Sequence, residues 1–288
     1  MAEIPASLVV KLRKMSGQGM MDCKKALEEA NGNIDEAMAI LRKKGLATLA
    51  KRAQRETTQG LVVSKTSPDG KIAVLASLCC ETDFVANSDD FKAAAGKVAE
   101  YALVCKADDG IGNLLETVVG GKKLRDVVTE VVSKTGEKTE VGDYARFRLN
   151  GPGLISTYVH FNSKVGTMLD IETGDDKTAQ SEQLKRTGAD LAMHITATKP
   201  LALDKSGIDP KVIEQEKSIY AEQVKNKPAN ILDKIVEGKI KKFYEENCLL
   251  EQKFVKDDTK TVSQVLEEAA RQTGGKATIK RFVRFDVG

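Results

Sequence analysis

The chain has 288 residues, of which 30% are charged and 5% are aromatic, and it contains no Trp. This length exceeds what one hydrophobic core usually serves, so we expect two or more domains in a helix-rich protein. No apolar run approaches the roughly 20 residues of a membrane helix. The N-terminal residues show no basic region ahead of an apolar stretch, so we expect a cytoplasmic protein without a membrane partner.

The charge is balanced, with 45 basic and 42 acidic residues and a net charge of +3. The two signs are interleaved, as in EGKIKKFYEEN at residues 237–247. Proteins that bind nucleic acids more often gather Lys and Arg on one face. We therefore interpret these charges as a solvated surface and predict no direct nucleic-acid partner.

Residues 1–45 read as a module of three short helices. Its first two apolar stripes are Ile4, Leu8, Leu12 and Met15, then Met20, Cys23, Leu27 and Ala30, at helical spacing. Gly32 is suited to close the second helix and Asn33 to cap the third. The pattern predicts that the third helix ends at Gly45 and that 46–59 is a polar linker with helical tendency.

At residue 60 the apolar period changes from helical spacing to alternation. GLVVSKTS, the turn SPDG and KIAVLASLCCET predict a hairpin whose second strand is buried on both faces. Two helices follow, at 88–107 and 122–134, the first capped by Asn87 or Ser88. We expect residues 60–140 to form the N-terminal half of the core.

The pattern then repeats in outline. Three alternating segments at 143–150, 154–162 and 165–173 are followed by a helical segment at 177–198 and, near the end, by a helix and a last strand. We expect 141–177 and 247–288 to form the C-terminal half of the core, with Phe161 on the same strand face as Ile155. Residues 178–246, punctuated by prolines, predict a helical protrusion. The fold class is therefore α+β.

The search for reaction chemistry finds little. The chain has no GxxxxGK[ST] phosphate loop and no complete GxGxxG, and its two histidines are far apart in the sequence. His194 lies in a mainly apolar segment, which we interpret as a packed histidine, whereas His160 is more open. We predict no catalytic residue, no metal site and no cofactor.

The five cysteines are Cys23, Cys79, Cys80, Cys105 and Cys248. Their number is odd and none has CxxC spacing, which in a cytosolic chain predicts free thiols. Cys79 and Cys80 are adjacent in a predicted strand, so their side chains point to opposite faces. A thiol enzyme that uses one of these two residues stays open as an alternative.

The stretch CCETDFVANSDDF, residues 79–91, joins the buried strand to the next helix. Asp89 and Asp90 suit the first turn of that helix. Asp83 and Phe84 have no such structural explanation. A large apolar ring on a turn, where nothing obvious covers it, points to contact with another molecule.

Two motifs resemble one family. LRKMSGQGMMDCKKAL, residues 12–27, and LCCETDFVAN, residues 78–87, are similar to the two signatures of the bacterial elongation factor Ts family. The resemblance extends in order over nearly the whole chain, through NGNIDEA, LAMHITATKP and FVRFDVG. It implies a ubiquitin-associated-like helical module, two core halves and a helical protrusion linked to dimer formation. Many members of that family continue past the last strand into a further helix.

The resemblance also implies a function. Members of the family bind the GTPase elongation factor Tu and release its GDP. The intruding element corresponds to Thr82, Asp83, Phe84 and Val85, with Phe84 entering between two helices of the partner beside its magnesium site.

Further implied partner contacts are Arg13, Met20, Met21 and, less securely, His160. Met20 also fits core packing of its module, whereas Met21 lies off the apolar stripe. An interaction protein that docks through its helical module without exchanging nucleotide is the other alternative.

Overall fold

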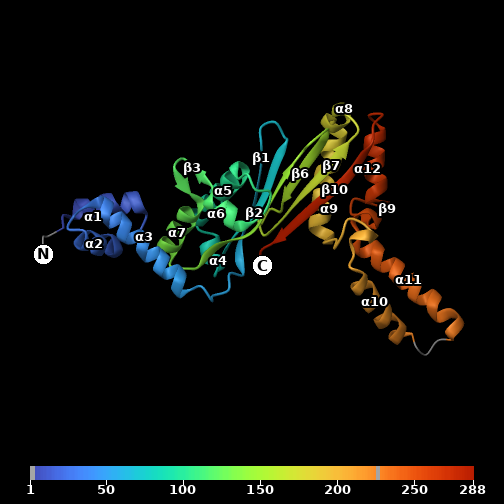
Figure 1. Ribbon diagram of the computed structural model, residues 1–288, viewed down its shortest axis with the longest axis horizontal. Coiled ribbons are helices and arrows are strands. Elements are labelled where there is room, and N and C mark those ends of the chain that lie inside the picture. Colours follow the sequence, from blue (N-terminus) through green and yellow to red (C-terminus); the bar gives the residue numbers. More distant parts are fainter. Residues whose placement is uncertain (1–3, 225–227) are drawn as a thin grey trace.

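The computed structural model describes residues 4–224 and 228–288. An N-terminal helical module, a core of sheets and covering helices, and a projecting helical hairpin follow one another along the long axis of the molecule (Figure 1). The predicted α+β class is confirmed.

The N-terminal module contains α1 (Ala6–Ser16), α2 (Met20–Glu29) and α3 (Ile34–Lys51). Their apolar faces meet in a small separate core that includes Leu12, Cys23 and Leu27. The predicted cap is present, since the Asn33 side chain accepts hydrogen bonds from the next helix's first turn at 3.0 and 3.3 Å.

The predicted end of the third helix at Gly45 is wrong, because α3 continues to Lys51. Gly45 has a different use. A Cβ there would lie 1.8 Å from Ser133 Oγ and 2.9 Å from the Thr129 carbonyl oxygen. The glycine thus lets α3 approach the core closely, and this tertiary packing outweighs the weak helix propensity of glycine.

The first half of the core is built on an antiparallel sheet of order β1-β2-β5, with β1 (Gln59–Thr66), β2 (Ile72–Cys80) and β5 (Thr139–Arg148). As predicted, β2 is buried on both faces, and all of its residues after Ile72 are buried. The third strand corrects an expectation. The pattern predicts that the segment at 143–150 belongs to the second half, but β5 pairs with β2.

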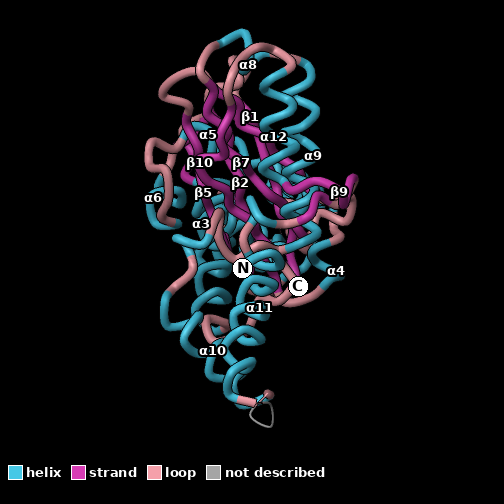
Figure 2. The backbone as a smooth tube through the Cα atoms, turned by 90° about the vertical axis from the view of Figure 1, so that its right-hand side faces the viewer, coloured by secondary structure: helices cyan, strands magenta, loops and turns pink. Residues whose placement is uncertain are grey.

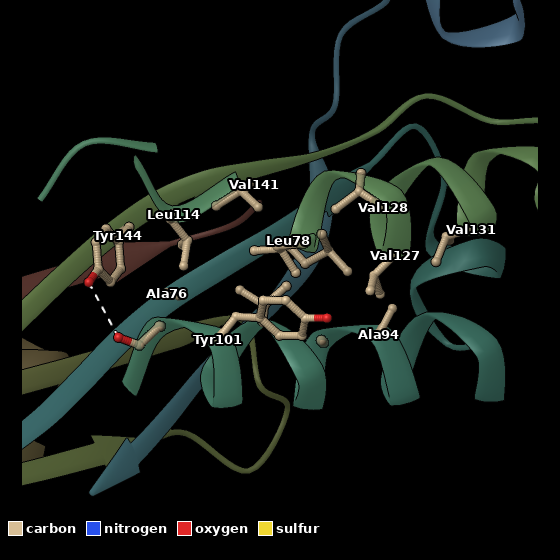
Figure 3. Close-up of a cluster of buried hydrophobic side chains, with 14 of the residues drawn as sticks. Ala76, Leu78, Ala94, Tyr101, Leu114, Val127, Val128, Val131, Val141 and Tyr144 are labelled. Carbon is tan, nitrogen blue, oxygen red and sulfur yellow. Dashed lines mark hydrogen bonds between the residues drawn. The ribbon is translucent and has the colours of Figure 1, made fainter. Parts of the chain in front are cut away.

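Two helices, α5 (Asp89–Val104) and α7 (Leu124–Thr135), cover one face of this sheet (Figure 3). Side chains such as Leu78 of β2, Tyr101 of α5 and Val128 of α7 fill the space between them. The Tyr144 hydroxyl donates to the Ala107 carbonyl at 2.7 Å, so the buried phenol is satisfied. Small elements not expected from the sequence complete this half: α4 (Asp83–Ala86), α6 (Ile111–Glu116), β3 (Val118–Val119) and β4 (Lys122–Lys123).

The second half has an antiparallel sheet of order β10-β7-β6, with β6 (Gly153–Val159), β7 (Val165–Thr173) and β10 (Ala277–Asp286). The predicted return of the last strand to this sheet is confirmed. Its outer face is covered by α9 and α12, and a short α8 lies beside it: α8 (Asp176–Gln180), α9 (Glu182–Thr198) and α12 (Val262–Arg271).

Two expectations about this half are corrected. The helices at 176–198 belong to the core, since α9 packs on β6 and β7, and are not part of the protrusion. Strand β6 ends at Val159, so Phe161 does not share a face with Ile155 but lies exposed in the following turn. In this turn Ser163 adopts a left-handed conformation with φ 55°.

The inner faces of the two sheets pack against each other. Val62, Leu75 and Phe147 of the first sheet meet Ile155 and Met168 of the second in one apolar cluster. The core is thus layered as helix, sheet, sheet, helix (Figure 1). Cys79 contributes to this inner cluster and Cys80 to the outer one under α5, as their adjacent positions predicted.

The projecting hairpin consists of α10 (Pro210–Gln223) and α11 (Ala229–Asn247). Its base packs on the core through a small cluster that includes Ile208, Phe243 and Cys248. The remaining short elements near this base are η1 (Lys205–Gly207), η2 (Leu249–Glu251), β8 (Lys253–Phe254) and β9 (Asp257–Thr261).

Candidate partner-binding site

The segment after β2 folds into a single helical turn, α4, that presents Phe84 outward. Thr82 caps this turn, its hydroxyl accepting a hydrogen bond from the Val85 N–H at 3.4 Å. Ala86 and Val85 face the core, Ala86 being 2% exposed. Phe84 points the other way and is 85% exposed. The predicted exposure of this ring is therefore present, on a helical turn that is itself anchored.

A half-buried glutamate holds the start of α4. Glu137 follows α7 and accepts two hydrogen bonds from Thr82, one from its N–H at 3.1 Å and one from its hydroxyl at 2.7 Å. Because a carboxylate makes stronger hydrogen bonds than a neutral acceptor, this contact fixes the N-terminus of α4 to the helix layer.

Glu81 provides a second anchor one residue earlier. Its carboxylate accepts from the Arg52 guanidinium at 2.8 Å to each oxygen and from the Lys138 N–H at 2.7 Å. Desolvation raises the pKa of Glu81, but these hydrogen bonds outweigh it and bring the pKa below its ordinary value. The ionised carboxylate thus ties together the end of α3, the end of β2 and the start of β5.

The far end of α4 is closed by side chains of the next segment. The Ser88 hydroxyl donates to the Val85 carbonyl at 2.7 Å and accepts from the Phe91 N–H at 3.3 Å, which makes Ser88 the cap of α5. Asp90 in the first turn of α5 pairs with Lys134 at 2.7 Å. In the described residues the Asp83 carboxylate has no hydrogen-bond partner, so Asp83 and Phe84 both face outward from a fixed frame.

The N-terminal module carries the second group of sequence-predicted contacts. Arg13, Met20 and Met21 are all exposed, Met20 by 43% and Met21 by 61%. Met20 is therefore not a core residue of its module, which removes the alternative that we left open. They belong to α1 and α2, which lie apart from α4 (Figure 1).

The module is attached to α7. Arg42 pairs with Asp126, and the Gln18 amide, oriented so that its nitrogen faces the Ser133 carbonyl at 2.8 Å, also accepts from the Lys134 N–H at 3.3 Å. Gln18 is only 6% exposed. These contacts attach the module to α7, the helix that ends just before Glu137.

His160, the remaining predicted contact, lies in the turn after β6 and is half-exposed. Its Nδ1 is 3.1 Å from the Tyr158 hydroxyl oxygen. The structure therefore distributes the predicted residues over three places: the α4 tip, the helical module and the turn at 160–164.

Sequence reasoning missed Glu137, Arg52 and Phe161. Nothing in the sequence linked Glu137 to Thr82, because 55 positions separate them. Phe161 carried a usable signal, since an aromatic residue between His160 and NSK lies at a turn, but the alternation of the strand before it hid the end of that strand.

Groups suited to reaction chemistry are scarce in the described residues. No cluster of three or more His, Cys, Asp or Glu side chains there is placed to hold a metal ion. Burial raises the pKa of the Cys79 thiol, and raises that of Cys80 to about 12. A nucleophilic cysteine needs the opposite shift, so the geometry argues against the thiol-enzyme alternative.

His194 is fully buried, and its ring bonds the Gln252 amide oxygen at 2.9 Å and the Val255 N–H at 3.3 Å. Desolvation lowers the pKa of this histidine, against a smaller opposite effect of Gln252. The interpretation of His194 as a packed, hydrogen-bonded histidine is confirmed.

No helix within residues 4–224 and 228–288 has the length and apolar character to cross a membrane. The described residues present exposed apolar side chains, Phe84 on the anchored α4 turn and Met20 and Met21 on the helical module. Exposed aromatic and methionine side chains are typical of surfaces that bind another protein.

Comparison with known proteins identifies the family. The family model for elongation factor TS matches residues 81–288. Elongation factor Ts of Nitratiruptor sp. is 42% identical over 287 residues, covering 99% of this chain and 93% of the relative. The protein of Desulfovibrio desulfuricans is 38% identical, with 100% and 99% covered, and that of Prosthecochloris aestuarii is 39% identical, with all of both chains covered. The chain belongs to the elongation factor Ts family, among the translation elongation factors.

Proposed function

We propose that this protein is the guanine-nucleotide exchange factor for elongation factor Tu and promotes release of its GDP. The family membership supports the partner and the class of activity. The observation that carries the proposal is Phe84, 85% exposed on a one-turn helix whose two ends are anchored.

In this proposal Phe84 inserts between two helices of the partner, beside its magnesium site. A phenylalanine brings a large apolar area on only two torsions, so little entropy is lost when the ring is fixed. Magnesium tolerates little departure from octahedral geometry. A small displacement of the helix that supports the metal therefore weakens binding of the nucleotide phosphates. Asp83, whose carboxylate has no partner in the described residues, binds polar groups that the insertion uncovers.

The other predicted contacts hold the partner rather than displace its ligand. Arg13, Met20 and Met21 dock the helical module on the GTPase domain, and His160 contacts a different domain of the partner. Methionine side chains suit such docking, because they are flexible and adapt to the surface they meet.

The remaining assignments follow the same family pattern. The α10–α11 hairpin serves dimer formation, and the protein works in the cytoplasm, with no nucleic acid bound directly. The chain acts through binding, without a covalent reaction of its own. The boundary between the core halves follows the sheets, so that β5 joins the first half.

The direct test is release of labelled GDP from purified elongation factor Tu, with and without this protein. We expect release to accelerate with the protein's concentration and to saturate. Binding to elongation factor Tu without faster GDP release would instead support a docking protein that does not exchange nucleotide. Absence of binding would contradict both functions.

A further inference from the structure

Phe161 is the most exposed of the large apolar side chains in the described residues. Its exposed fraction is 90%, compared with 85% for Phe84 and 64% for Leu201, the next in order. No core packing requires a phenylalanine there. Aromatic residues are enriched at protein–protein interfaces relative to the rest of the surface.

The turn that carries Phe161 is held firmly. The His160 N–H donates to the Val165 carbonyl at 2.9 Å, and the Ser163 N–H donates back to the His160 carbonyl at 2.7 Å. The His160 ring lies against Phe161, with 4.4 Å between the ring centroids, and is itself bonded to Tyr158. The ring is thus presented from a fixed turn, as Phe84 is from α4.

Both phenylalanines lie at the same end of the two-sheet core. The Ser163 carbonyl accepts from the Val62 N–H of β1 at 2.7 Å, and the Lys164 ammonium bonds the Gln59 side chain at 2.7 Å. Gln59 pairs with Cys80, the last residue of β2 before the α4 segment. The start of β1 therefore connects the Phe161 turn to the Phe84 tip.

The two views agree with this placement. The C-terminus, whose Val287 N–H donates to the Lys164 carbonyl at 2.8 Å, marks the position of the turn. It lies near α4 in both orientations (Figures 1 and 2). A protein that covers α4 and extends across the start of β1 meets both rings.

We propose that Phe161 is a second aromatic anchor for the same partner as Phe84, elongation factor Tu, and fills an apolar pocket on a part of that protein away from its nucleotide. This inference rests on the proposed function. The continuity of the surface from α4 through Gln59 to the turn favours one partner over a second copy of this chain. The turn belongs to the second sheet and is separate from α4. Phe161 therefore strengthens binding of the partner, while Phe84 disturbs the metal site and weakens binding of the nucleotide.

A hollow beside the turn fits this role. It has a volume of about 520 Å³ and is lined by Tyr158, His160, Met193 and Thr196 among others. In the proposed complex, Phe161 enters a pocket of the partner, and a neighbouring side chain of the partner has room to enter this hollow. Ring and hollow together give complementary contacts in both directions, as in well-packed interfaces.

The test compares Phe161→Ala with wild type in GDP release from elongation factor Tu, at a series of concentrations of this protein. We expect the half-saturating concentration to rise about tenfold or more, as for loss of an aromatic anchor, with the maximal rate within about twofold of wild type. Leu201→Ala removes another exposed apolar side chain, near the base of the hairpin, and is expected to change neither value. Unfolding temperatures check that each variant is folded.

Two outcomes overturn the anchor. One is a half-saturating concentration for Phe161→Ala within about twofold of wild type. The other is a loss of self-association by Phe161→Ala in sedimentation velocity, which would assign the ring to a second copy. If the wild-type protein leaves GDP release unchanged, the proposed function is contradicted instead. Direct binding of wild type and of Phe161→Ala to nucleotide-free elongation factor Tu then tests the anchor alone.

Discussion

The α4 tip and the N-terminal module both present apolar side chains to solvent, but they are built in opposite ways. The tip is one helical turn, framed by Glu81, Glu137 and Ser88, that offers a single stiff ring. The module is three helices with their own small core, and it offers flexible methionines. It meets the rest of the chain along α7.

The difference indicates two kinds of work in the proposed complex. We call the α4 tip with Asp83 and Phe84 the wedge. It must displace a helix beside the metal site, so it needs a rigid support, which the hydrogen bonds to the Glu81 and Glu137 carboxylates provide. A docking surface must fit an outline that changes as the partner moves, so adaptable side chains on a separate module are suitable. We call the surface of the module that carries Arg13, Met20 and Met21 the dock.

The largest effect is expected for Phe84→Ala. The maximal rate of GDP release should fall about 30-fold or more, since truncating a buried aromatic anchor costs about 2 kcal/mol or more. The unfolding temperature should stay within about 1 °C of wild type, because the ring is exposed in the free protein. Stopped-flow release of fluorescent GDP and thermal unfolding give the two values.

Val118→Ala is a matched control for this variant, because Val118 is 50% exposed on β3 and lies outside the α4 frame. It should leave both values unchanged. A much lower unfolding temperature for Phe84→Ala would show that the ring is a core residue, contrary to the wedge.

Loosening the frame should have the next largest effect. Glu137→Ala removes both acceptors of Thr82, and hydrogen bonds to a charged group contribute about 1.5–3 kcal/mol. We expect the maximal release rate to fall about tenfold, with a smaller change in the half-saturating concentration. Glu130→Ala is the control, because Glu130 lies on α7, the helix that precedes Glu137, and its carboxylate pairs with Lys122. Equal rates for the two variants would mean that the frame does not support the wedge.

Sequence patterns predicted the parts of this site that depend on local chemistry. The exposed position of Phe84 followed from an aromatic on a connection without a core partner, and the Asn33 cap from residue type and spacing. The frame did not follow, because Glu137 and Arg52 reach α4 only through the tertiary fold. The position of β5 was also beyond the pattern, since alternation shows that a strand exists but not which sheet it joins.

The dock should show a smaller effect of another kind. We expect the double variant Met20→Ala and Met21→Ala to raise the half-saturating concentration about fivefold and to leave the maximal rate unchanged. Val10→Ala in the same module, where Val10 is 41% exposed, controls for general changes of that surface. A fall in the maximal rate without a change in half-saturation would assign these methionines to the wedge.

The smallest effect concerns stability and lies outside both regions. Burial holds the pKa of His194 below its ordinary value of 6.5, so below that pH the unfolded chain takes up a proton that the folded chain does not. Stability should therefore decrease as the pH falls from about 6.5 toward the folded-state pKa. Unfolding temperatures measured at several pH values should fall less steeply for His194→Gln than for wild type or His160→Gln. Parallel curves would show that His194 does not titrate in this way.

The central claim is that this protein binds nucleotide-free elongation factor Tu better than the GDP-bound form. Binding free energies in such a cycle are reciprocal, so GDP must weaken binding of this protein by the factor by which this protein weakens binding of GDP. The most direct measurement is a titration of complex formation against GDP, at high and at low magnesium. We predict that GDP lowers the affinity and that magnesium strengthens this effect. Equal affinity for the nucleotide-free and GDP-bound partner would contradict the exchange mechanism, however tightly the two proteins bind.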